Sequence, residues 1–191
     1  MFSFGHFLAT SLSADEKEAL SDAFSEIDRS DDRAAAIVAA AFLDDHLTIA
    51  LKTRLHQDEE ILKDFFRPSG PLGSFSAKID LAFLIGLCSR ETCKELHTIR
   101  DIRNAFAHKG LTRDFNSQRV RDLANNLTFG KKFKITITPA DKGDDAEPVF
   151  VSGEEHKPKT PREHYIRACQ MLLSCLVSSN STRPPPPAPE F

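Results

Sequence analysis

The feature that most constrains the fold of this chain is a helix-start signal followed by apolar residues at helical spacing, which recurs along most of its length. Ser13-Ala-Asp-Glu16 is a capping box, in which the serine and the glutamate each bind a free N–H group at the start of a helix. Thr160-Pro-Arg-Glu163 repeats the pattern, with proline at the first helical position. Apolar side chains then recur every three or four residues, as one buried helix face requires. The sequence therefore predicts a mainly helical protein.

The same signals give the expected element order. Ser30 or Asp31, Ser74, Ser89 and Asn116 are expected to cap further helices. The second helix is apolar on more than one side, so we expect it to be the central core helix. About six or seven helices are predicted, at residues 13–28, 34–55, 61–66, 74–87, 90–109, 116–127 and 160–177.

One segment departs from the helical pattern. Residues 133–137 alternate apolar and polar side chains. Residues 149–151 are expected to form the second strand, after a loop rich in Asp, Gly and Pro. This pattern favours a β-hairpin at about residues 132–152, inserted in the bundle. With 191 residues, a single helical domain over residues 13–179 is expected, with an N-terminal extension at 1–12 and a disordered proline-rich tail at 180–191.

Charge and cysteine usage exclude several classes of protein. A net charge of −3 argues against a generally cationic nucleic-acid binder, although residues 98–121 carry six basic residues against two acidic ones. The four cysteines form no C-x-x-C pair, so we expect reduced thiols, a cytoplasmic location and no metal or other cofactor. The longest apolar run, Leu81–Cys88, is too short to span a membrane.

The candidate site is the segment from Arg100 to His108. Asn104 and His108 are four residues apart and share a helix face with Arg100, while Arg103 lies one position off that stripe. Metal-free phosphodiester chemistry needs an imidazole that moves a proton and a guanidinium that holds phosphate oxygens. The competing interpretation is a polar seam, either solvated or between helices.

Under the chemical interpretation each residue has a role. His108 is the general base or acid at a ribose 2′-hydroxyl, and Arg103 stabilises charge on the phosphoryl oxygens. Asn104 orients the histidine or binds phosphate. Arg100 and Lys109 hold flanking phosphates.

Three further features each leave two interpretations open. Asp45, on the central helix, is either solvated or paired with Arg103 or Arg100, as a structural salt bridge or as part of the binding site that orients the arginine. The loop at residues 67–73, with two prolines and two glycines, is either a backbone nest for an anion or a tight connector between helices. Phe115, between Asp and Asn, either contacts a partner or a base, or anchors its loop in the core.

Four features of the chain occur together: Gly70-Pro-Leu-Gly73, the helix that follows it, Ser89-Arg-Glu-Thr, and the basic helix that ends at Arg103…His108. With these features, about half of the chain, residues 30–128, resembles the mannitol operon repressor family. This resemblance implies an all-helical regulator in a setting of sugar-alcohol utilisation.

Arg103-Asn104-x-x-x-His108 also resembles the R-N-x-x-x-H signature of the HEPN superfamily. Members of that superfamily are small α-helical bundles, often dimeric. Some are metal-independent endoribonucleases, and others bind RNA or nucleotides without catalysis. The resemblance covers these three residues only, and it implies a homodimer in which two copies of the motif helix face each other.

The sequence therefore predicts a transcriptional regulator of the mannitol operon repressor type that acts through protein–protein contacts. Sequence-specific DNA binding is poorly supported, because the basic helix stops at Gly110 and no second helix follows at helix-turn-helix spacing. The alternatives are a metal-independent endoribonuclease or toxin that uses Arg103 and His108, and a non-catalytic RNA- or nucleotide-binding module. The regulator is preferred, and an enzymatic role is left open.

Overall fold

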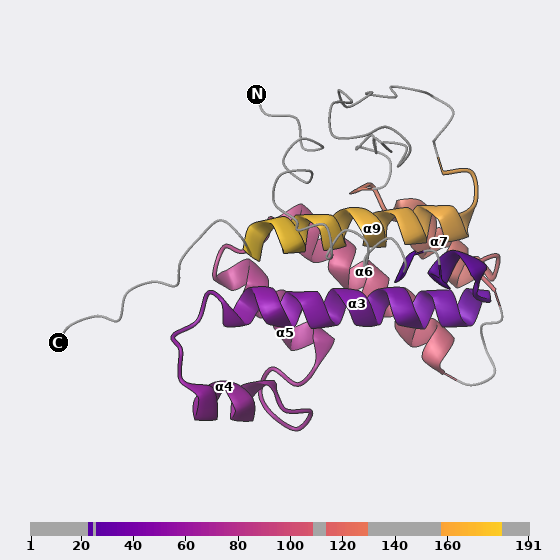
Figure 1. Ribbon diagram of the computed structural model, residues 1–191. Helices are drawn as coiled ribbons and strands as arrows, with labels where there is room; N and C mark the ends of the chain where they lie inside the picture. The colour runs from indigo at the N-terminus through magenta and orange to yellow at the C-terminus, as the bar shows by residue number, and fades with distance from the viewer. Residues whose placement is uncertain (1–22, 25, 109–113, 130–157, 181–191) are drawn as a thin grey trace, which may run out of the picture.

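The computed structural model describes residues 23–24, 26–108, 114–129 and 158–180, and over these ranges the chain is an α-helical bundle (Figure 1). The predicted mainly α fold is confirmed. The predicted β-hairpin and the N-terminal extension lie outside the described residues, as does the tail beyond Asn180. After a short helical segment at 26–29, the helices are α3 (Asp32–Lys52), α4 (Glu59–Phe66), α5 (Phe75–Leu84), α6 (Arg90–Ala107), α7 (Gln118–Asn126) and α9 (Pro161–Asn180).

The helix starts form as their capping residues predict. The Asp31 carboxylate accepts a hydrogen bond from the Ala34 N–H group at 2.8 Å. Ser74 and Ser89 cap α5 and α6 in the same way. Each cap satisfies an N–H group that has no partner within its own helix, which fixes where the helix begins.

The start of α7 is displaced by one residue from the prediction. Its N-cap is Ser117, whereas Asn116 was expected. The Asp114 carboxylate accepts hydrogen bonds from the N–H groups of Asn116 (2.9 Å) and Ser117 (3.0 Å). This Asx turn holds Asn116 in the loop and starts the helix after it.

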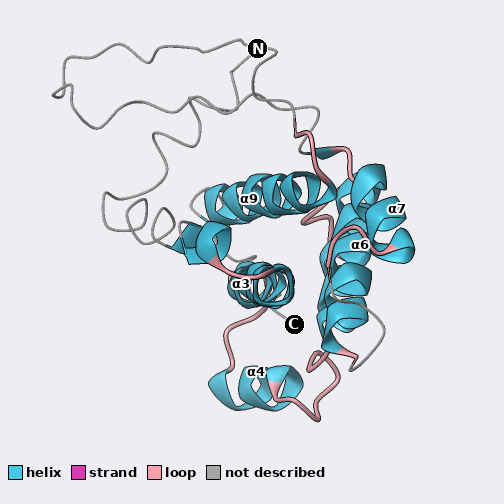
Figure 2. Ribbon diagram, turned by 90° about the vertical axis from the view of Figure 1, so that its right-hand side faces the viewer, coloured by secondary structure: helices cyan, strands magenta, loops and turns pink. Residues whose placement is uncertain are grey.

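The central helix is α3, which packs against α5, α6 and α9 (Figures 1 and 2). By length and composition α3 is also the described helix that could cross a membrane, a test that buried core helices pass as well. Five of its eight buried residues are alanines, and these small side chains let α9 approach closely. The eight buried residues, Ala35, Ala36, Ala39, Ala40, Leu43, Leu47, Ala50 and Leu51, mark α3 as a core helix of the bundle.

An aromatic cluster joins α6, α9 and the loop before α7. The Phe115 ring lies 4.9 Å from that of Phe106 and 5.2 Å from that of Tyr165, measured between centroids. The Phe115 side chain is 2% exposed, and its N–H group donates to the Asp32 carboxylate at 2.9 Å. Phe115 is therefore a buried loop anchor, and the alternative of an exposed ring is wrong.

Helix α4 lies below α3 at the edge of the bundle, and none of its residues is buried (Figure 2). The loop after it folds back on its last turn: the Leu72 N–H group donates to the Phe65 carbonyl at 2.9 Å. A Cβ atom at Gly70 would collide with the carbonyl oxygens of Asp64 and Phe65, and Gly73 lies equally close to backbone. The loop at residues 67–73 is thus a tight connector, with glycine required because only hydrogen fits beside those carbonyls.

Candidate functional site

The candidate residues lie along one edge of α6. The buried stripe of this helix, which includes Leu96, Ile99, Ile102 and Phe106, faces the core. Helical spacing then sets Arg100, Arg103 and Asn104 at the half-buried border of that stripe.

The structure brings Arg103 and Asn104 together. The Arg103 guanidinium donates to the Asn104 side-chain oxygen at 2.9 Å. The guanidinium is also near the buried hydroxyl of Tyr165: burial raises the pKa of Tyr165 well above its ordinary value of 10, and the positive charge of Arg103 opposes that rise. Arg103 is therefore close enough to α9 for its charge to act on the Tyr165 hydroxyl.

His108 ends the helix. Its N–H group still donates to the Asn104 carbonyl at 3.2 Å, but the backbone turns to an extended conformation, and the side chain is exposed. Within the described part of the chain, its imidazole makes no hydrogen bond to Arg103 or Asn104. The Arg33 guanidinium of α3 reaches the Ala107 carbonyl at 3.5 Å, where a positive charge complements the helix dipole. Lys109, the next predicted phosphate-binding residue, lies outside the described residues.

Arg100 is engaged between α5 and α6. Its guanidinium donates to the Ser76 hydroxyl at 2.7 Å, to the Asp101 carboxylate at 2.6 Å and to the His97 Nδ1 atom at 3.0 Å. His97 in turn bonds the Asp80 carboxylate at 2.9 Å. These contacts have the character of an inter-helix polar seam, the competing interpretation of the motif helix.

Asp45 pairs with neither arginine within the described ranges and is exposed on α3. The neighbouring Asp44 makes an ion pair instead, with the buried Lys78 of α5 at 2.7 Å, while the Asp44 side chain itself is 22% exposed. Successive residues of a helix are about 100° apart around its axis. Asp44 therefore points toward α5, while Asp45, one position later, points toward solvent.

Two structural residues escaped the sequence reasoning. The Glu95 carboxylate is buried and accepts hydrogen bonds from the N–H groups of Thr128 and Phe129 and from the Thr128 hydroxyl. Arg162 donates to the Asp32 carboxylate and to three carbonyls at residues 27–30. For Glu95, the sequence does offer one indication of burial, because this residue is adjacent to Leu96, which belongs to the apolar stripe of the helix.

An exposed apolar surface lies on α4. Ile61 and Phe65 are four residues apart on one face of the helix, and they are 55% and 44% exposed. The next residue, Phe66, has its ring half-buried against the core, with the Lys52 ammonium 5.2 Å from its centroid. We call the pair Ile61 and Phe65 the α4 face. Two large apolar side chains held out from one helix are a candidate protein-binding surface.

The thiol of Cys175 on α9 supports a pH-dependent prediction. Burial raises its pKa from an ordinary 9.0 to about 11. Because only the thiolate is nucleophilic, alkylation by iodoacetamide at pH 7 should be about 100-fold slower than for an unshifted thiol. The rate should climb about tenfold per pH unit up to about pH 11. Peptide mass mapping of a timed reaction measures this, and a rate that levels off by pH 9 would contradict it.

Comparison with known proteins supports the fold. A chain in the X-ray structure of the MtlR–HPr complex from Escherichia coli is similar, with a TM-score of 0.59 and 15% sequence identity over 83% of this chain and 98% of that chain. The expected mannitol-repressor-like fold is thereby confirmed, while the R-N-x-x-x-H resemblance stays a prediction. No protein-family model and no curated protein matches the chain.

Proposed function

We propose that this chain is a regulatory protein of the mannitol operon repressor type, which acts in the cytoplasm, as a homodimer, by binding another protein. The observation that carries the proposal is the fold, which is similar to a chain crystallised in the complex of MtlR with HPr. The polar bonds of Arg100 and Arg103 along α6 add support, because those side chains already have partners in this protein.

We assign the contact to the α4 face. Specific interfaces are built around a few large apolar side chains that become fully buried on binding. Ile61 and Phe65 have this character, and the same helix and its N-cap carry four exposed acidic residues, Asp58, Glu59, Glu60 and Asp64, against one exposed lysine, Lys63. A partner with an apolar centre and a basic rim would complement that surface.

HPr is the first partner to test, because the similar structure is a complex with it. Titration calorimetry should give saturable binding of HPr to the wild-type chain. Phe65→Glu should weaken this binding at least tenfold, since it buries a charge at the centre of the contact. Val38→Glu on α3 is the matched control, because Val38 is also a partly exposed apolar residue, and it should leave the affinity unchanged.

Two results would count against this proposal. Equal binding by the Phe65→Glu and wild-type chains would remove the α4 face from it. No binding at all would leave the protein-contact function without its first candidate partner, and light scattering on the same sample tests the proposed homodimer separately.

RNA cleavage is the second candidate, favoured by the bonded Arg103–Asn104 pair beside an exposed His108. The test is cleavage of RNA by the wild-type chain in EDTA, beside His108→Ala purified identically. Cleavage by the wild type alone would establish a metal-independent ribonuclease and displace the regulator. If neither protein cleaves RNA, the enzymatic alternative is wrong.

A further inference from the structure

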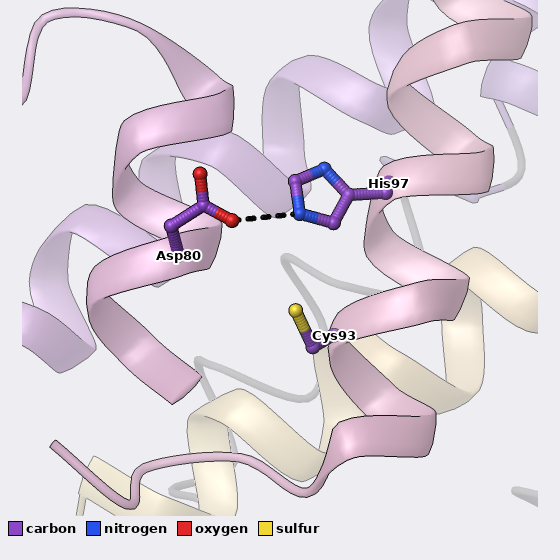
Figure 3. Close-up of side chains that lie close together, drawn as sticks. All are labelled: Asp80, Cys93 and His97. Atoms are coloured by element: carbon purple, nitrogen blue, oxygen red, sulfur yellow. Dashed lines mark hydrogen bonds and ion pairs between the residues drawn. The ribbon is translucent and has the colours of Figure 1, made fainter. Parts of the chain in front are cut away.

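Three side chains with metal-binding atoms converge between α5 and α6. Cys93 and His97 are one helical turn apart on α6, and Asp80 approaches from α5 (Figure 3). The Cys93 sulfur, a His97 ring nitrogen and an Asp80 oxygen all lie within 4.8 Å of one another. The Asp80 carboxylate is the most exposed of the three groups, so the cluster opens to solvent.

We propose that Asp80, Cys93 and His97 form a binding site for a divalent transition metal, with Zn²⁺ as the best fit. Thiolate, imidazole and carboxylate are the three protein ligands that zinc accepts. A calcium or magnesium site would instead require oxygen ligands. The sequence expectation of no metal rested on the absence of C-x-x-C spacing, and that spacing says nothing about ligands from two helices.

The geometry requires only small adjustments. Bonds of about 2.0–2.3 Å at tetrahedral angles separate neighbouring ligand atoms by roughly 3.3–3.8 Å. The Asp80 oxygen and His97 Nε2 atom are 2.9 Å apart and would move slightly apart, and the Cys93 sulfur already lies within 4.8 Å of both. Three protein ligands leave a fourth position for water, which suits a cluster at the surface.

Arg100 links this site to the segment from Arg100 to His108 of the same helix. An arginine N–H group can only donate, so its 3.0 Å bond makes His97 Nδ1 the acceptor and places the ring proton on Nε2. A metal on Nε2 requires the proton on Nδ1, which would then face another donor. Metal binding therefore releases Arg100 from His97 and leaves the guanidinium with Ser76 and Asp101. Metal binding and the Arg100–His97 bond exclude one another.

Cobalt binding tests the site without any activity assay. Co²⁺ replaces Zn²⁺ at tetrahedral sites, and a bound thiolate produces charge-transfer absorption in the near ultraviolet. The reduced full-length chain titrated with Co²⁺ should show this band, and Zn²⁺ should remove it. Cys93→Ser should abolish the band, and His97→Ala should weaken cobalt binding at least tenfold. Circular dichroism verifies that each variant remains folded.

The control variants separate this site from other thiols. Two control variants should keep the band: Cys175→Ser on α9, and Cys88→Ser. The second is the stricter control, because the Cys88 thiol is close enough to Cys93 for their charges to interact. Arg100→Leu should tighten cobalt binding about tenfold, because it removes the donor and the positive charge that compete with the metal.

No band in the wild type, or a band that survives in Cys93→Ser, would overturn the proposal. If Arg100→Leu binds cobalt with the same affinity as the wild type, the proposed competition between the metal and the Arg100–His97 bond is wrong. The test is independent of the regulatory function proposed above, since neither HPr nor RNA is present.

Discussion

Replacing Asp44 with alanine is expected to lower the free energy of unfolding by about 3–5 kcal/mol. The Lys78 ammonium bonds the Asp44 carboxylate at 2.7 Å, and the lysine side chain is only 9% exposed. Without its partner, this charge would be left in the interface between α3 and α5 with little access to water. The loss follows mainly from the stranded charge, because an intact buried pair contributes little over apolar residues of the same size.

A second substitution distinguishes this cause from simple loss of packing. Lys78→Met removes the buried charge, so the double variant Asp44→Ala/Lys78→Met should recover most of the lost stability. Asp45→Ala is the matched control, because Asp45 is the exposed neighbour on the same helix, and it should change stability by less than about 0.5 kcal/mol. Urea unfolding followed by circular dichroism gives the free energy of unfolding of the wild type and of each variant. A loss below about 1 kcal/mol in Asp44→Ala would contradict the stranded-charge account.

Phe115→Ala should destabilise the protein by a similar amount, about 3–5 kcal/mol. Its ring fills the space between Phe106 and Tyr165, so truncation leaves a cavity where α6 and α9 meet. Phe65→Ala is the control of equal chemistry. Its ring is 44% exposed, and truncation there should cost less than about 1 kcal/mol. Thermal and urea unfolding of the two variants measure the difference, and equal losses would show that Phe115 is not a core anchor.

The parts of the fold that follow from local chemistry were predictable from sequence. Asp31, Ser74 and Ser89 cap helices because each cap involves residues only three apart. The buried stripes follow from periodicity in the same way. The start of α7 was off by one residue because Asp114 and Asn116 compete locally for the turn, and both are good turn residues.

The candidate site was less predictable, because its contacts join distant segments. The motif residues do share one edge of α6, as their spacing predicts. Two contacts around them, however, join distant segments: Arg100 bonds Ser76, which is 24 residues away, and Asp44 bonds Lys78, which is 34 away. Asp44 lies on the side of α3 that faces α5, whereas the adjacent Asp45 lies on the solvent side, and telling them apart requires knowing which way α3 faces. The cluster at Asp80 depends on the packing of α5 on α6, for which the sequence carries no local signal.

The closely packed loop after α4 has a consequence for association. Many exposed segments must be ordered when a partner binds, and the lost conformational entropy weakens the complex. In this protein Gly70 and Gly73 let the chain fold back on the carbonyls of α4 and of the residues just after it, and the Leu72 N–H group is bonded there. A partner that binds Ile61 and Phe65 therefore meets a preorganised surface, and little ordering remains to oppose the association.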